Sequence, residues 1–187
     1  MSGFEIALIT LTMVLGGSIV WYTLILGISP MPSTQKAQKA MLKLSGGTGT
    51  GPIFELGSGW GNILIPLAKQ YPHRQIIGYE LSFMPWLVTL IITKLLGLNN
   101  TKLLRKNFLQ ADLSSASVIV CYLFPGGMNT IEHKLKKECG NLEYLISNNF
   151  SLPSHNPVKT IQLDDLYQSP IYLYQFKERL EGSTTKI

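Results

Sequence analysis

The feature that most constrains this chain is a short apolar run followed at once by three glycines at alternate positions. Residues 52–56 have the composition of a buried strand, and Gly57, Gly59 and Gly61 follow them. A helical pattern continues the chain, with apolar residues on one face at Ile63, Leu64, Leu67 and Ala68. Glycine accepts positive φ and lets a ligand lie against bare backbone, and a helix start offers unpaired N–H groups. The segment therefore predicts a strand, turn and helix that cradle a ligand.

Three interpretations of this glycine loop are open. It can be a tight turn without a ligand. It can be the dinucleotide fingerprint, which needs a glycine three positions after the second one, where this chain has Asn62. It can also be the acidic-x-Gly-x-Gly-x-Gly loop that binds S-adenosylmethionine, which residues 55–61 match position for position. The spacing favours this loop, which resembles motif I of the class I methyltransferases. That resemblance implies cofactor binding by Glu55, Gly57, Ser58, Gly59 and Gly61.

Glu80 is a second acidic residue at a position suited to binding the ribose of a cofactor. Residues 75–81 are predicted to form a second strand, with Glu80 at its carboxyl end, about 20 positions beyond the glycine loop. A carboxylate there can accept hydrogen bonds from both ribose hydroxyls of a nucleoside cofactor. An ordinary exposed glutamate is the alternative. The pairing with the loop favours cofactor binding by Glu80, with Leu81 beside it.

The next segment is predicted to hold a helix and a third strand. Residues 83–98 form a very apolar helix, which implies burial on most sides or contact with a membrane surface. Residues 103–109 have the pattern of a strand. Asn107 and Phe108 lie at or just after its end, where adenine would sit in the proposed fold. The alternative role for both residues is a strand end and a helix cap.

Residues 116–124 form the clearest buried strand, and Pro125 terminates it. Ligands of open α/β sheets bind outside the carboxyl ends of the strands. Tyr122, Phe124 and Pro125 are therefore candidates for the rim beside the transferred methyl group, although core packing competes as an explanation for both aromatic residues. Beyond them we expect a helix, a fifth strand and a terminal antiparallel hairpin, over residues 129–138, 142–150, 160–163 and 171–176.

The amino-terminal end predicts a membrane anchor. No charged residue occurs from Ile6 to Ile28, and about 23 residues at 1.5 Å each give roughly 34 Å of helix, enough to cross a bilayer core. The start lacks the basic region of a signal peptide, so we predict one uncleaved transmembrane helix within residues 1–28. Lysines follow this span and none precedes it, which places the catalytic domain on the cytoplasmic or topologically equivalent side.

Domain organisation and composition narrow the remaining possibilities. Residues 29–51 are predicted to be a proline- and glycine-rich connector with a short helix, and residues 52–187 the catalytic domain. The net charge is +5, without the dense basic cluster or aromatic platform of a nucleic-acid binder. Two cysteines and three histidines lack metal-ligand spacing, so we expect no metal.

The order of motifs resembles a more specific group. A Pro-x-Pro-Ser connector, the Gly-Ser-Gly loop, the 78–81 strand end and the 150–153 segment follow one another as in the small membrane-anchored protein-lysine methyltransferases, whose mitochondrial members modify the adenine nucleotide translocase and the ATP synthase c-subunit. The resemblance implies an α/β, Rossmann-like fold, with a mostly parallel seven-stranded sheet and a C-terminal antiparallel hairpin. It also implies S-adenosylmethionine as cofactor and a membrane protein as substrate. Family members usually carry an acidic residue and arginine where this chain has Trp60 and Asn62.

The implied reaction is transfer of a methyl group from a sulfonium to a lysine amine, in which the enzyme contributes mainly alignment and proximity. The amine must be neutral, and walls such as Tyr122 and Phe124 can favour that form by desolvation. Two alternatives stay open. The acceptor can be a lipid or an apolar small molecule, or the chain can be an inactive scaffold with the same fold, an idea that rests on Trp60 in the glycine loop.

Overall fold

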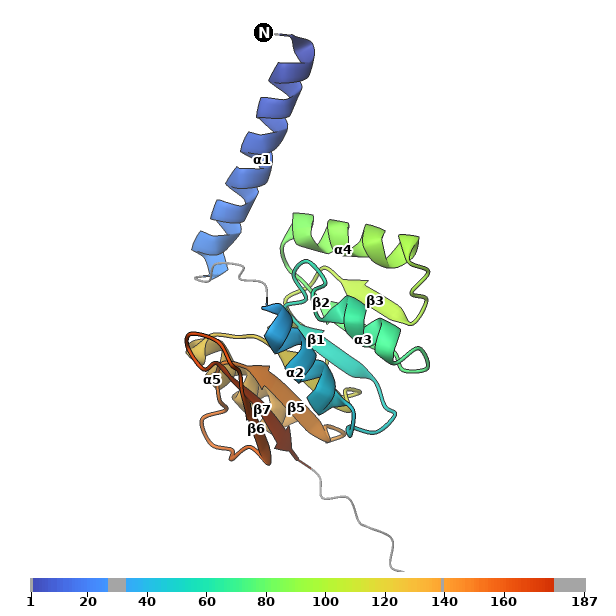
Figure 1. Cartoon of the computed structure of the whole chain (residues 1–187), viewed down its shortest axis with the longest axis vertical. Helices are drawn as coiled ribbons and strands as arrows, with labels where there is room; N and C mark the ends of the chain where they lie inside the picture. The colour runs from blue at the N-terminus through green and yellow to red at the C-terminus, as the bar shows by residue number, and fades with distance from the viewer. Residues whose placement is uncertain (1, 27–32, 139, 177–187) are drawn as a thin grey trace, which may run out of the picture.

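The structure is a computed structural model that describes residues 2–26, 33–138 and 140–176. Its centre is a seven-stranded sheet with the order β3-β2-β1-β4-β5-β7-β6 (Figure 1). The strands are β1 (Ile53–Leu56), β2 (Ile76–Tyr79), β3 (Thr101–Leu104), β4 (Val118–Cys121), β5 (Tyr144–Asn148), β6 (Lys159–Gln162) and β7 (Pro170–Gln175). Strands β1 to β5 pair in parallel, whereas β7 runs antiparallel to both β5 and β6. The predicted mostly parallel sheet with a terminal antiparallel hairpin is confirmed.

Helices cover both faces of this sheet (Figure 1). The helical segments are α1 (Gly3–Leu26), α2 (Gln35–Ser45), α3 (Leu64–Gln70), α4 (Phe83–Leu95), the short 3-10 helix η1 (Phe108–Gln110) and α5 (Pro125–Glu138). One hydrophobic core lies between the sheet and helices α2 and α3, and a second lies between the sheet and α5. Side chains of β1 alternate between them, because Ile53 packs in the first core and Phe54 in the second.

Several predicted boundaries need correction. The buried strand predicted over 116–124 is limited to Val118–Cys121, and the helix predicted over 83–98 ends at Leu95. The third strand is shorter than the predicted 103–109, because the chain turns after Leu104, whose carbonyl accepts a hydrogen bond from the Lys106 N–H. The helix predicted over 129–138 begins earlier, at Pro125. Proline suits the first helical turn because it has no N–H to satisfy there and its φ is already helical. Pro125 therefore opens helix α5, whereas the buried strand β4 already ends at Cys121.

The predicted transmembrane anchor within residues 1–28 is not supported. The chain is helical over α1. Across residues 2–26, 33–138 and 140–176, however, no helix combines the length and the apolarity that crossing a bilayer requires. Residues 27 and 28 of the predicted span lie outside the described part of the chain.

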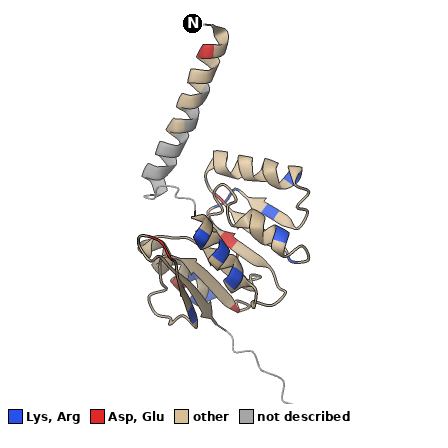
Figure 2. Cartoon of the chain, viewed as in Figure 1, with Lys and Arg blue, Asp and Glu red and all other residues tan. Residues whose placement is uncertain are grey.

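Helix α4 is not buried on most sides, which was one of the two alternatives that its apolar sequence left open. Its buried positions are Pro85, Thr89 and Thr93, which recur every four residues along one face. Its large apolar side chains are half-buried or exposed. Figure 2 shows blue, the colour of Lys and Arg, near one end of α4, and no red, the colour of Asp and Glu, along it. The helix thus turns small and hydroxyl-bearing residues inward and large apolar residues outward.

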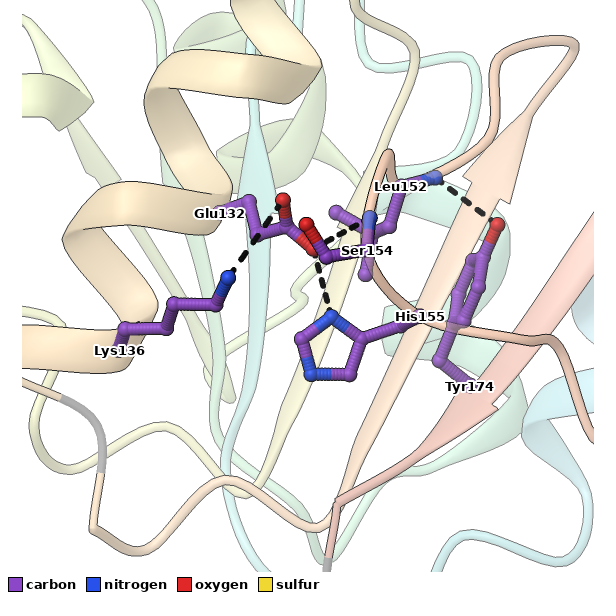
Figure 3. Close-up of polar contacts among 6 residues, drawn as sticks. All are labelled: Glu132, Lys136, Leu152, Ser154, His155 and Tyr174. Carbon is purple, nitrogen blue, oxygen red and sulfur yellow. Dashed lines mark hydrogen bonds and ion pairs between the residues drawn. The ribbon is translucent and has the colours of Figure 1, made fainter.

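The segment that follows β5 is fastened to helix α5 and strand β7 (Figure 3). Glu132 is buried on α5, and its Oε1 accepts a hydrogen bond from the Ser154 N–H at 3.1 Å and lies 2.6 Å from His155 Nδ1. The Leu152 N–H donates to the Tyr174 hydroxyl at 2.9 Å. These contacts hold the backbone after β5 at two points on the α5 face of the sheet.

The same contacts set the charge of Glu132. Burial raises its pKa, but the hydrogen bonds from His155 and Ser154 and the charge of Lys136 outweigh burial, so the pKa lies below its usual 4.5. A carboxylate whose pKa is lowered by folding stabilises the protein above its unfolded pKa, and this stabilisation is lost as the pH falls through the folded value. The cluster should therefore contribute fully at neutral pH and weaken in acid.

We expect Glu132→Gln to lower the free energy of unfolding by about 1–3 kcal/mol at neutral pH, because it removes charge-assisted hydrogen bonds from a buried site. The loss should shrink as the pH falls below the usual value of 4.5. Denaturant titrations at neutral and acidic pH measure both quantities. The control is Glu138→Gln, whose exposed carboxylate pairs with Lys134 and should contribute less than about 0.5 kcal/mol. A Glu132→Gln loss that does not change with pH would contradict the assignment.

Candidate active site

The glycine loop has the backbone conformation that its sequence predicts. Gly57, Gly59 and Gly61 have φ values of +79°, +50° and +77°, a region that strains other residues. A Cβ built on Gly61 would lie 2.7 Å from Thr89 Cγ2, so helix α4 packs directly against the loop. A Cβ on Gly57 or Gly59 would meet no described atom within 4 Å. The loop therefore presents bare backbone to open space at these two positions.

Glu80 holds this loop in place. Its Oε2 accepts a hydrogen bond from the Gly59 N–H at 2.8 Å, and its Oε1 accepts one from the Ser82 N–H at 2.7 Å. The Thr89 hydroxyl donates to the Gly59 carbonyl at 3.0 Å. Each carboxylate oxygen has a second acceptor position, so Glu80 can order the loop and still accept a hydroxyl of a ligand. Leu81 follows it directly and is half-buried.

Glu55 is buried in β1 and carries a polar atom without a partner. Its Oε2 and the Ser58 hydroxyl make no hydrogen bond within the described residues. Burial raises the pKa of Glu55 well above 4.5 and the nearby Glu80 raises it further, while a backbone hydrogen bond from Leu64 lowers it. Buried polar atoms without partners are uncommon in folded proteins. An ammonium donor such as that of S-adenosylmethionine would satisfy the carboxylate, so these residues fit the predicted cofactor.

Asn107 and Phe108 lie just after β3, the neighbour of β2 in the sheet. The Asn107 side chain accepts a hydrogen bond from the Leu109 N–H at 2.9 Å and so caps η1. Phe108 is half-buried and packs against the core that covers the α5 face. Asn107 therefore acts as a helix cap, which the sequence analysis gave as the alternative to adenine binding.

Three aromatic side chains lie near the ends of β4 and β5. We call Tyr122, Phe124 and Phe150 the aromatic rim. The rings of Tyr122 and Phe150 stack, with centroids 6.3 Å apart and an interplanar angle of 21°. Tyr122 is 36% exposed and Phe124 is 42% exposed, so neither is a core side chain. A Cβ on Gly126 would lie 2.6 Å from the Phe124 ring, which rests against the first turn of α5 after Pro125.

Phe150 was not among the site residues expected from the sequence. Its role depends on the stack with Tyr122, which joins residues from two strands and leaves no local pattern. The position of Phe150, two residues beyond β5, could have indicated a site residue. The carboxyl ends of parallel strands share one edge of a sheet, where ligands bind.

The sheet order brings these features to one edge. Strands β2, β1, β4 and β5 are consecutive neighbours, so Glu80, the glycine loop and the aromatic rim follow adjacent strand ends. The connection after β1 crosses one face through α3, and the connection after β4 crosses the other through α5. Such a switch point is where open α/β sheets bind ligands. The arrangement is suited to holding a nucleoside cofactor near exposed aromatic side chains.

Comparison with known proteins identifies this arrangement. The chain matches the family model of the ANTKMT methyltransferase domain over residues 55–159, more than half of its length. A relative from Saccharolobus islandicus (strain REY15A), named a protein-lysine N-methyltransferase, is 25% identical over 150 residues, which cover 79% of this chain and 93% of the relative.

Solved structures share the fold. An RNA methyltransferase from Salinibacter ruber in complex with S-adenosyl-L-homocysteine has a TM-score of 0.70 at 22% identity, covering 80% of this chain and 96% of that one. A magnesium protoporphyrin IX methyltransferase from Synechocystis PCC 6803 with its bound cofactor has a TM-score of 0.58 at 14% identity, covering 74% and 77%. The glycine loop, the fold and the family match agree: the chain belongs to the ANTKMT methyltransferase domain family and is an S-adenosylmethionine-dependent methyltransferase.

Proposed function

We propose that this methyltransferase acts on lysine side chains of a membrane-associated protein. The observation that carries the proposal is the aromatic rim, which lies beside the glycine loop at the carboxyl ends of adjacent strands. The name of the Saccharolobus islandicus relative supports a lysine acceptor. The order of motifs shared with membrane-anchored lysine methyltransferases supports an acceptor that belongs to a membrane.

In this proposal one group of residues binds the cofactor, and the aromatic rim receives the acceptor lysine. Glu80 holds the loop and is placed to accept ribose hydroxyls, while Glu55 and Ser58 offer polar atoms to the methionine end. When bound, S-adenosylmethionine supplies an electrophilic methyl group whose leaving group is a neutral thioether. Such a displacement needs no acid on the leaving side, so the contribution of the chain is alignment and proximity.

The aromatic rim has two tasks in this proposal. Apolar rings exclude water from the incoming side chain and so lower the pKa of its amine, which favours the neutral, nucleophilic form. The faces of the Tyr122 and Phe150 rings can also stabilise the cationic product. Because Tyr122 and Phe124 are partly exposed, a proton from the amine can leave to the solvent that contacts these rings.

The direct test uses the full chain, methyl-labelled S-adenosylmethionine and isolated membrane proteins. We expect label in methyllysine after acid hydrolysis, and none with Glu80→Ala, because that variant loses both bonds that order the loop. Glu138→Ala, on the exposed surface of α5, is the control and should keep activity. Label recovered in a lipid extract would replace the lysine acceptor with a lipid. Cofactor binding without transfer to any acceptor would favour a scaffold.

Phe150→Ala should lower kcat/KM for the protein acceptor by roughly tenfold, because it removes one wall of the aromatic rim. Cofactor affinity should stay at the wild-type level, since no described contact joins Phe150 to the glycine loop. Steady-state kinetics and calorimetry separate the two effects. Tyr122→Phe keeps the ring stack and should keep most of the activity. A Phe150→Ala variant that loses cofactor affinity instead would contradict the assigned role.

Cofactor affinity should rise with pH. Glu55 has a raised pKa and must lose its proton before it can accept a cationic group, so binding should release a proton. Below the raised pKa the affinity should increase by up to about tenfold per pH unit. Calorimetry in two buffers of different ionisation enthalpy measures the released proton. Glu55→Gln should abolish the release and Glu138→Gln should not; equal release from Glu55→Gln and wild type would refute the assignment.

A further inference from the structure

The orientation of helix α4 is fixed by its contact with the glycine loop. Thr89 is fully buried, donates to the Gly59 carbonyl, and would collide with any side chain at Gly61. Pro85 and Thr93 lie on the same buried face. Small side chains are needed there because the helix approaches the loop backbone closely. This contact determines which residues α4 turns outward.

The outward residues are mostly apolar. At 100° per residue, the side opposite the buried face holds Phe83, Leu87, Ile91, Lys94 and Leu95, which we call the outer face of α4. Leu95 is 81% exposed and Ile91 is 48% exposed. A helix on an α/β sheet normally turns its apolar residues toward the sheet. The outer face is therefore a mostly apolar strip. Within the described part of the chain its residues are exposed, except Leu87, which is half-buried.

The charged side chains in the segment that carries this strip are all positive. From residue 81 to residue 111 there is no aspartate or glutamate, while Lys94, Lys102, Arg105 and Lys106 are present and exposed. The Arg105 guanidinium lies 5.4 Å from the centre of the Phe83 ring, so a cation lies at the edge of the strip. Strand β3, which α4 contacts, is an edge strand of the sheet.

We propose that the outer face of α4 binds the surface of an anionic lipid bilayer. Apolar and aromatic side chains flanked by lysine and arginine are the composition of helices that lie in a membrane interface. Each basic residue near an anionic leaflet adds favourable energy. A second copy of the chain is a poorer occupant, because a two-fold contact between these faces would oppose like charges. The binding is peripheral and requires no helix to cross the bilayer.

Such binding would orient the active site. Helix α4 begins three residues after Glu80, and its Thr89 contacts the glycine loop, so the cofactor residues lie directly behind the helix. A bilayer against the outer face would bring the active site close to the lipid surface. The inference goes beyond the proposed function and does not rest on it, because lipid binding is measured without methyl transfer.

Flotation of the full chain with phosphatidylcholine vesicles, with and without phosphatidylserine, tests the proposal. Ile91→Glu/Leu95→Glu should bind the anionic vesicles roughly tenfold more weakly than wild type, or worse. The matched control is Leu166→Glu/Tyr167→Glu, which adds the same charge at side chains 89% and 85% exposed, beyond the opposite edge of the sheet. It should bind like wild type. Lys94→Gln and Arg105→Gln should each cost about fivefold, on anionic vesicles only.

A reporter pair locates the contact and stands even if the glutamate variant fails to fold. Leu95→Trp adds an indole to the outer face, and Leu166→Trp adds one at the opposite edge. Brominated lipid in anionic vesicles should quench the indole added at position 95 and spare the one at position 166. Vesicle binding without quenching at position 95, or equal losses in both double variants, would overturn the proposal. So would self-association that Ile91→Glu/Leu95→Glu abolishes while vesicle binding persists.

Discussion

The carboxylate of Glu80 makes the hydrogen bonds on which the glycine loop, our proposed cofactor site, depends. One oxygen accepts the Gly59 N–H and the other accepts the Ser82 N–H, so a single side chain joins the turn after β1 to the start of α4. Thr89 adds a further link between α4 and the loop, because its hydroxyl donates a hydrogen bond to the Gly59 carbonyl. Because three segments share these bonds, the loop can keep its positive-φ conformation without a ligand present. The site is preorganised by bonds that lie within the chain itself.

The sequence predicted the parts of this molecule that depend on local patterns. The glycine spacing, the apolar run of β1 and the helical face with Leu64 and Leu67 are all found in the structure. The terminal hairpin is found for the same reason, since two short strands separated by a polar turn need only their neighbours to pair. Features of this kind are encoded by residues that are close in the chain.

What the sequence did not predict depends on contacts between distant residues. Helix α4 is highly apolar, so its composition left burial and contact with a membrane surface both open. The contact with the glycine loop makes the threonine face the inner one. The stack of Phe150 on Tyr122 depends on the pairing of β4 with β5. The end of β3 differs from expectation because the chain turns at Lys106. The start of α5 differs because Pro125 is compatible with the first helical turn.

The close approach of Gly61 and Thr89 separates two kinds of change along one helix. Any larger residue at either position would push α4 off the glycine loop, so the inner face is constrained by its contact with that loop. The outer face makes no contact with that loop, and its residues can be exchanged without moving the glycine backbone. Related chains can therefore diverge in what their helix binds while the cofactor site stays as it is, and an engineer can alter the two properties independently.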